Sequence, residues 1–149
     1  MDSGNFCYEY PRPAVTTDCA VFSFDNEDIN ILLIQRKLDP YKGRWALPGG
    51  FMQMDETAEE CARRELFEET GFRDIELEQL YTFTDVDRDP RGRTISIAYV
   101  AIVDASDRII TAGDDAENAQ WFSLKSIPEL AFDHDLILKL ALEKTRENK

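Results

Sequence analysis

The chain has 149 residues, 43% hydrophobic and 32% charged, a composition typical of one globular domain and unlike that of a disordered chain. Its formal net charge of −13 disfavours nucleic acid as a partner, because the average field repels a polyanion, but it allows a phosphorylated ligand held through metal ions. No apolar run approaches the ~20 residues of a membrane helix, no signal peptide is recognised, and three scattered cysteines suit neither a disulfide framework nor zinc, so we expect a cytoplasmic protein without a membrane partner.

The first third of the chain reads as a β-hairpin followed by loops. Residues 14–24 and 29–36 are apolar and β-branched, and the polar residues 25–28 between them are turn-like, which predicts two paired strands. Residues 39–52 contain the prolines and glycines of loops around short extended pieces.

Residues 57–70 give the clearest helix prediction. Thr57 and Glu60 have the spacing of a capping box, in which each side chain accepts a hydrogen bond from the other's backbone at the start of a helix. Gly71 stands where a helix ends in a left-handed conformation, which glycine adopts without steric cost. Both ends of this helix are therefore specified locally.

The remainder of the chain alternates strand and helix patterns. Strands are predicted over 75–84, 94–103 and 119–124, with a polar loop over 85–93, and a terminal helix over 135–146. No linker or repeat divides the sequence, so we expect a single domain spanning the whole chain. Strands mixed with two well-separated helices predict an α/β fold in which helices cover a mixed β-sheet.

Three carboxylates gather on one face of the predicted 57–70 helix. Glu65, Glu68 and Glu69 lie at positions i, i+3 and i+4, so they share about 100° of arc and repel one another. Such a cluster is tolerated when a cation binds among the carboxylates, and hard oxygen ligands suit Mg²⁺ or Mn²⁺. The adjoining Pro48-Gly49-Gly50 loop can turn backbone carbonyls toward the same cation. Arg64 lies off this face, and Glu56 is its expected partner.

The alternative for such a run is a solvated acidic helix balanced by arginines. Residues 50–72, however, match the pattern G-x5-E-x7-R-E-U-x-E-E-x-G-U, where U is apolar, at every fixed position. The fixed positions are Gly50, Glu56, Arg64, Glu65, Leu66, Glu68, Glu69, Gly71 and Phe72. This stretch resembles the signature of the Nudix hydrolase family, and the resemblance extends from about Pro11 to the terminal helix.

The resemblance implies a Nudix-type α/β/α sandwich and hydrolysis of a nucleoside diphosphate linked to another moiety, with Mg²⁺ or Mn²⁺ as cofactor. It implies that Glu65, Glu68 and Glu69 bind metal together with the carbonyl of Gly49. Glu65 and Glu68 are thus expected catalytic residues. So are Arg64 and Glu56, as the ion pair that orients the helix.

The general base that activates water is not fixed by this resemblance. It is either a glutamate of the helix or an acid on a distal loop, where the candidates are Asp114, Asp115 and Glu117. These three residues also fit an ordinary solvated turn.

Three other stretches, YKGRWALPGGF, TFTDVDRDPRGRTISIAYVA and LAFDHDLI, are similar to the branch of ADP-ribose pyrophosphatases and related ADP-ribose-sensing regulators. Arg88, Arg91 and Arg93 are expected to bind substrate phosphate bidentately, unless they belong to a solvated hairpin turn. The leading expectation is hydrolysis of ADP-ribose to AMP and ribose 5-phosphate. The alternatives are a housecleaning hydrolase of oxidised or non-standard nucleoside triphosphates and a non-catalytic sensor. The regulators carry a further C-terminal DNA-binding domain, whereas this chain ends soon after its last predicted helix, which favours the enzyme.

For several other aromatic residues and the one histidine, we expect ordinary structural roles. Phe6, Tyr8 and Tyr10 fit a frayed tail or the contact of a homodimer better than a stack on a base. The two tryptophans, Trp45 and Trp121, are expected in the core. The same default assigns His134 to a helix cap or the surface rather than to a ligand.

Overall fold

The computed structural model describes residues 5–25, 27–104 and 118–147. In chain order the elements are β1 (Ala14–Asp25), β2 (Asp28–Gln35), β3 (Trp45–Ala46), β4 (Gly49–Phe51), α1 (Ala58–Thr70), β5 (Glu78–Phe83), β6 (Thr94–Asp104), β7 (Asn118–Ser123), the 3-10 turn η2 (Leu124–Ser126) and α2 (His134–Glu147). Neither helix in this described part is long and apolar enough to cross a membrane.

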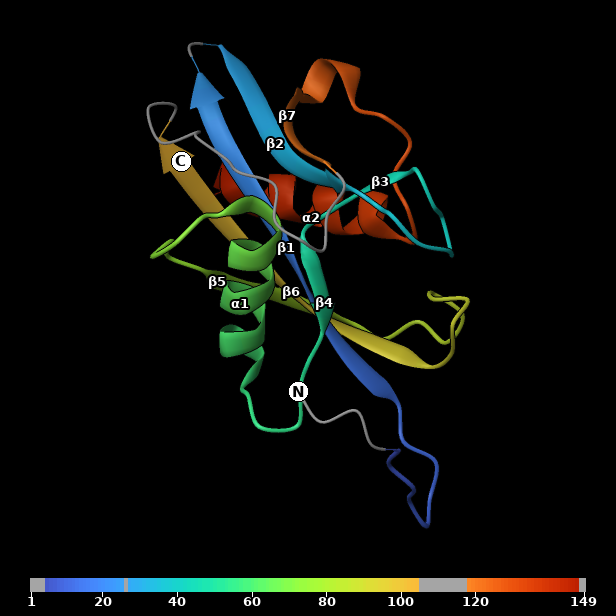
Figure 1. Ribbon diagram of the computed structural model, residues 1–149. Helices are drawn as coiled ribbons and strands as arrows, with labels where there is room; N and C mark the ends of the chain where they lie inside the picture. Colours follow the sequence, from blue (N-terminus) through green and yellow to red (C-terminus); the bar gives the residue numbers. More distant parts are fainter. Residues whose placement is uncertain (1–4, 26, 105–117, 148–149) are drawn as a thin grey trace.

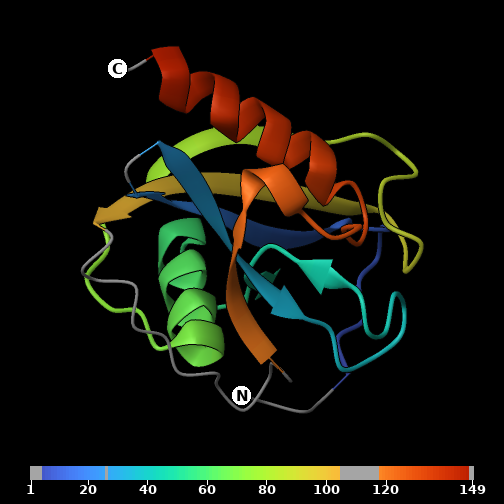
Figure 2. The same cartoon turned by 90° about the horizontal axis from the view of Figure 1, so that it is seen from above.

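The strands form one mixed sheet with a helix on each face. Its main order is β3-β2-β1-β6-β5, while β4 pairs with β1 and β7 pairs with β2. The central pair, β1 and β6, is parallel, and the predicted hairpin of β1 and β2 is antiparallel, so both kinds of pairing occur. Figures 1 and 2 show α1 and α2 on opposite faces of this sheet. The predicted α/β/α sandwich is confirmed.

Successive apolar side chains of the central strands point alternately into two hydrophobic cores, one on each face of the sheet. Val21 of β1 packs with Leu66 on the α1 side, whereas its neighbour Phe22 packs with Ile137 on the α2 side. All four side chains are at most 2% exposed. Successive side chains of a strand point to opposite faces, so an uninterrupted apolar strand serves both layers. Each such side chain stabilises the fold by roughly 1.5–3 kcal/mol.

The local signals at both ends of α1 are confirmed. The Glu60 amide donates to Thr57 Oγ1 at 3.1 Å, and the Thr57 amide donates to Glu60 Oε1 at 2.8 Å, which completes the capping box. At the other end Gly71 has φ 83°, and its amide donates to the Phe67 carbonyl at 2.8 Å. These caps fix where α1 begins and ends relative to the loop that precedes it.

The predicted strands match the observed ones to within one residue at each end, except at the start of β5. The strand expected over 75–84 begins only at β5, because Asp74 has a left-handed backbone with φ 54° and Arg63 Nη1 donates to the Ile75 carbonyl. That carbonyl is therefore taken up by a side chain instead of a strand partner. β7 lies one residue earlier than the predicted 119–124.

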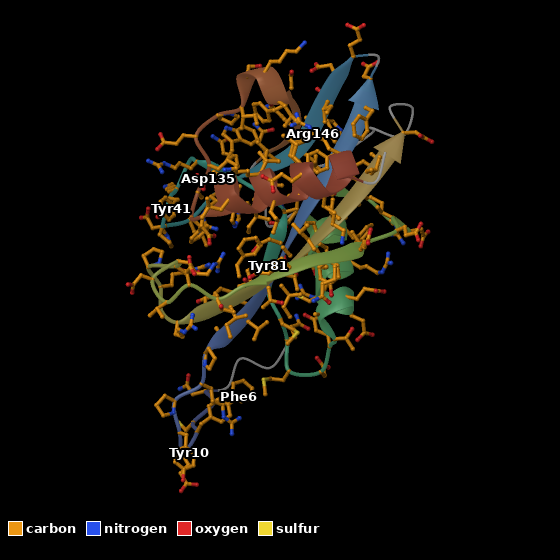
Figure 3. The ribbon with its side chains drawn as sticks, turned by 180° about the vertical axis from the view of Figure 1, so that it is seen from behind. Phe6, Tyr10, Tyr41, Tyr81, Asp135 and Arg146 are labelled. Carbon is orange, nitrogen blue, oxygen red and sulfur yellow. The ribbon has the colours of Figure 1, made fainter. Side chains whose placement is uncertain are left out.

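The segment before β1 projects away from the sandwich, and Figure 3 shows its labelled aromatic rings at the lower end of the molecule. Phe6 and Tyr10 are 54% and 70% exposed. Tyr8 donates from its hydroxyl to the sulfur of Met54 at 3.9 Å, and the Arg12 guanidinium lies 3.8 Å from the Tyr8 ring centroid. The roles considered for these rings, a tail, a dimer contact or a base stack, remain predictions.

The two tryptophans pack as expected. Trp45 meets Phe122 edge-on at 4.8 Å between ring centroids, and Trp121 meets Phe72 edge-on at 6.1 Å. Each indole is half-buried against one of the two cores.

Candidate active site

The acidic face of α1 meets Gly49 and Gly50, the first two residues of the short strand β4. Gly49 donates its amide to Glu69 Oε1 at 2.8 Å, and Glu69 is only 5% exposed. A Cβ on Gly50 would lie 2.6 Å from the carboxyl carbon of Glu65, closer than atoms can approach. The absence of side chains at these two positions lets β4 approach the glutamates.

Arg64 connects the helix, the loop before it and two of the glutamates. Its Nη2 and Nε donate to the two carboxylate oxygens of Glu56 at 2.7 and 2.9 Å, so the expected ion pair is present and bidentate. Its Nη1 also donates to Glu65 Oε1 at 2.9 Å and to Glu68 Oε2 at 3.2 Å. The prediction that Arg64 points away from the glutamates was wrong, because a wheel angle describes Cβ and ignores the reach of a long side chain. Glu65 and Glu68 converge on one cationic nitrogen.

Hydrogen bonds and burial fix the ionisation states of Glu56, Cys61 and Arg64 around this helix. The bidentate hydrogen bonds from Arg64 lower the pKa of Glu56 to about 2, and Glu56 in turn raises the pKa of Arg64. Burial raises the pKa of the Cys61 thiol to about 11. That sulfur accepts a hydrogen bond from Thr17 Oγ1 at 3.2 Å, so Cys61 stays a protonated packing residue. The site supplies carboxylates rather than a thiolate nucleophile.

The donor chemistry beside β4 fits a hard divalent cation. In residues 5–25, 27–104 and 118–147 no group of three acidic, histidine or cysteine side chains is arranged as a finished metal cage. Nevertheless Glu65 and Glu68 already share one cationic group, and the missing Cβ of Gly50 lets the Glu65 carboxylate lie directly against the backbone of β4. Carboxylate and carbonyl oxygens at this density suit Mg²⁺ or Mn²⁺.

A buried chain of hydrogen bonds holds the segment that leads into β4. Leu47 donates its amide to Nδ1 of His134, the first residue of α2, at 3.0 Å, and Nε2 of His134 lies 3.3 Å from Asp18 Oδ1. Ser96 donates to the other Asp18 oxygen, and Asp18 pairs with Gly49 across β1 and β4. Burial opposes ionisation of Asp18, but His134 and Ser96 hold its pKa below the ordinary value. Of the two default roles for His134, a helix cap or the surface, the surface role was wrong, since the residue is 4% exposed.

A cleft lined by both arginines and carboxylates opens beside β4. Its lining includes Arg36, Arg88 and Arg91, the carboxylates Asp18 and Asp89, and Gly49, Gly50 and Phe132. The lining residues come from five separate stretches of the chain, so no spacing in the sequence connects them. Gly49 and Gly50 of β4 thus lie between the cleft and the acidic face of α1.

The three arginines predicted to bind phosphate are placed differently. Arg88 forms a bidentate pair with Asp133 at 2.6 and 2.9 Å and is almost wholly buried, with 3% of its side chain exposed. Arg91 pairs with Asp89 at 2.8 Å but keeps 34% of its side chain exposed in the cleft. Arg93 donates to the Asp85 carbonyl at 3.2 Å and is not part of the cleft lining. The structure therefore brings Arg88 and Arg91 to the cleft, and Arg91 presents the more accessible charge.

Sequence reasoning missed three residues of this region. Asp18 and Arg36 lie in or just after apolar strands, where the pattern gave no sign of a site. Phe132 stands in the LAFDHDLI stretch, which was singled out only as a resemblance. The three candidates for a distal base, Asp114, Asp115 and Glu117, lie outside the described residues.

Comparison with known proteins decides the family. The NUDIX domain family model matches residues 12–141, which is most of the chain. The chain belongs to the Nudix family. It is 45% identical over 130 residues to a Methanocaldococcus jannaschii protein named ADP-ribose pyrophosphatase, covering 87% of this chain and 73% of that one.

Two further similar proteins respond to ADP-ribose or were crystallised with it. The Acinetobacter baylyi ADPR responsive transcriptional repressor NtrR is 38% identical over 142 residues, covering 91% of this chain. Our chain spans only 56% of that repressor's length. The crystal structure of the NUDIX domain of Shewanella oneidensis NrtR complexed with ADP ribose superposes with a TM-score of 0.85 at 29% identity, covering 91% of this chain and 90% of that one.

Proposed function

We propose that this chain is a divalent-metal-dependent Nudix hydrolase that converts ADP-ribose and water to AMP and ribose 5-phosphate. The observation that supports it most is that Gly49 and Gly50 of β4 separate the acidic face of α1 from a cleft that contains three arginines. Carboxylates alone would repel a diphosphate, whereas a metal cation bound among them turns the local interaction into an attraction. The names of the relatives support ADP-ribose as the nucleoside diphosphate.

In this proposal Glu65, Glu68 and Glu69 bind Mg²⁺ or Mn²⁺, with the Gly49 carbonyl as a further ligand. A bound cation neutralises the diphosphate and lowers the pKa of an attached water. Arg64 keeps Glu65 and Glu68 turned toward the same point.

Glu68 is our choice for the general base within the described residues. Its side chain is 38% exposed, compared with 14% for Glu65, so it is the more accessible to an attacking water. The water gives up a proton to this carboxylate and attacks one phosphorus, and the bond from that phosphorus to the bridging oxygen breaks. The other phosphate leaves with the bridging oxygen, which gives AMP and ribose 5-phosphate.

A substrate panel tests the reaction. Purified protein with Mg²⁺ is incubated with ADP-ribose, other sugar nucleotides, dinucleotides and damaged deoxynucleoside triphosphates, and products are separated by chromatography. We expect fastest turnover of ADP-ribose, and a Glu68→Gln variant slower by about 100-fold or more with nearly unchanged melting temperature. If ADP-ribose survives while a damaged triphosphate is cleaved, the housecleaning alternative replaces this proposal.

A non-catalytic ADP-ribose sensor is the second candidate, and the 38% identity to a repressor favours considering it. The complete set of acids on α1 favours turnover, since binding alone does not require a base. Tight binding of ADP-ribose in Mg²⁺ without release of AMP would select the sensor. Release of both products at substoichiometric enzyme would exclude it.

We also propose that residues 1–149 act as a single Nudix domain, as a homodimer, in the cytoplasm. All three cysteines are free thiols, which suits a reducing compartment. Light scattering after size-exclusion chromatography measures the assembly directly.

A further inference from the structure

His134 is the first residue of α2, yet its imidazole is buried and bonded at both ring nitrogens. Nδ1 accepts a hydrogen bond from the Leu47 amide at 3.0 Å, and Nε2 lies 3.3 Å from Oδ1 of Asp18. Since Nδ1 acts as an acceptor, the proton of the neutral ring is on Nε2 and is donated to Asp18. The two contacts therefore fix one tautomer and one orientation of the ring.

Both partners of His134 are neighbours of Gly49. Leu47 precedes Gly49 by two residues, and Asp18 faces it across the antiparallel pair of β1 and β4. A Cβ on Gly49 would lie 2.6 Å from Asp18 Oδ1, the oxygen that His134 contacts, and closer still to the Thr17 carbonyl. Only glycine therefore lets the backbone pack here. His134 thus acts on Gly49 along the chain through Leu47 and across the sheet through Asp18.

The strand pairing turns the polar backbone groups of Gly49 away from β1. The preceding residue, Pro48, bonds to β1, because the Cys19 amide donates to its carbonyl at 2.8 Å. In an antiparallel pair alternate residues bond to a given neighbour, and the N–H and C=O of one residue leave the strand at the same edge. The Gly49 amide donates to Glu69 Oε1 at 2.8 Å, so this edge faces the acids of α1. The Gly49 carbonyl leaves β4 on that side too.

We propose that His134 is a positioning residue, which holds the Gly49 carbonyl in the direction needed to bind the divalent cation. It acts through Leu47 and Asp18 rather than as a ligand. The inference rests on the proposed function, because the cation is the one assigned there to the acids of α1. It adds a contribution from α2, which Figure 2 shows on the opposite face of the sheet from α1. Groups that orient a metal ligand change metal affinity by roughly 10–100-fold when they are removed.

Manganese binding, followed by electron paramagnetic resonance, tests this role without turnover. The variants are His134→Ala, His134→Asn and the control Ile137→Ala, which removes a fully buried side chain of the same helix from the core on the α2 side. We expect His134→Ala to raise the Kd for Mn²⁺ about tenfold, and the control to stay within about twofold of wild type. His134→Asn should recover much of the affinity, because its side-chain oxygen can replace Nδ1 as the acceptor for Leu47.

Hydrogen exchange of the Gly49 amide in the metal-free protein gives a second readout. This amide donates to Glu69, so its exchange rate reports how firmly the backbone is held at the site. We expect exchange about fivefold faster in His134→Ala than in Ile137→Ala, after each rate is corrected for the global stability of the variant. A histidine that only stabilised the fold would leave the corrected rates equal, and that result would overturn the positioning role.

The outcomes separate the positioning role from the proposed function. If His134→Ala melts cooperatively and binds Mn²⁺ as tightly as wild type, the positioning role alone is overturned. Equal weakening by Ile137→Ala overturns it too, because lost packing on α2 would then be sufficient. If His134→Ala does not fold, His134→Gln replaces it, and an unchanged Kd in that variant has the same meaning. Wild type that binds no Mn²⁺ removes the metal site and the positioning role together, whereas His134-dependent Mn²⁺ binding without ADP-ribose turnover supports the role and removes only the substrate.

Discussion

Glu56 and Arg64 tie the loop before α1 to the helix through two hydrogen bonds of 2.7 and 2.9 Å. The pKa of Glu56 falls from 4.5 to about 2 in the folded protein, so its ionised form stabilises the fold. That contribution is complete above pH 4.5 and is lost as the pH falls toward 2. A Glu56→Gln variant should melt lower than wild type at pH 7 and show a flatter dependence of melting temperature on pH in this window. Glu59→Gln, which changes an exposed ion pair, is the control and should differ by less than ~1 kcal/mol.

His134, on α2, is a second single residue that stabilises the fold, through its contacts with Leu47 and Asp18. His134→Ala should cost about 1–3 kcal/mol in denaturant unfolding, because it leaves the buried Leu47 amide and the Asp18 carboxylate each short of a partner. His134→Asn retains an acceptor near the position of Nδ1, and His134→Gln retains a donor near that of Nε2. Partial recovery of stability by either would identify which bond matters more. Three variants as stable as wild type would contradict the network.

At the scale of elements, the ends of α1 give a clean separation of stability from chemistry. Thr57→Ala removes the N-cap and should destabilise the protein by ~1 kcal/mol. Gly71→Ala should cost a similar ~1 kcal/mol, because a Cβ is strained at φ 83°. Both residues stand at the ends of the helix, outside the set of Glu65, Glu68 and Glu69, so kcat at low temperature should stay within about twofold of wild type. A large loss of kcat in Thr57→Ala, with folding intact, would show that the helix start also positions the acids.

The helices and strands also show which features of the fold can be predicted from the sequence. The caps of α1 and the alternation in β1 were predictable because each depends on residues within one element. The late start of β5 depends on Arg63 reaching the Ile75 carbonyl, and the burial of His134 depends on Leu47 and its surroundings, 87 residues away in sequence. Contacts of that kind have no local period or spacing. Glu65, Glu68 and Glu69 were recognised because all three fall within one helix, whereas Arg36 meets Phe132 only in the folded chain.

At the scale of the whole molecule, a chain of net charge −13 must attract a ligand that is itself anionic. The fold places two kinds of charged groups on either side of Gly49 and Gly50 in β4. Acids on α1 are suited to collect cations, and arginines in the cleft present positive charge directly. Long-range repulsion remains, so the KM for ADP-ribose should fall as salt rises from about 20 to 200 mM at saturating Mg²⁺, because screening weakens the net negative field. A steep rise in KM would instead show that local attraction dominates.

The central claim is that Glu65, Glu68 and Glu69 hold a divalent cation, and manganese titration followed by electron paramagnetic resonance tests it most directly. Wild type should bind at least one Mn²⁺, Mg²⁺ should displace it, and Glu68→Gln or Glu69→Gln should weaken binding about tenfold or more. Glu59→Gln, on the same helix but outside this set, should bind as wild type does. If free Mn²⁺ is undiminished by wild type, or if all these variants bind it equally, the claim is contradicted.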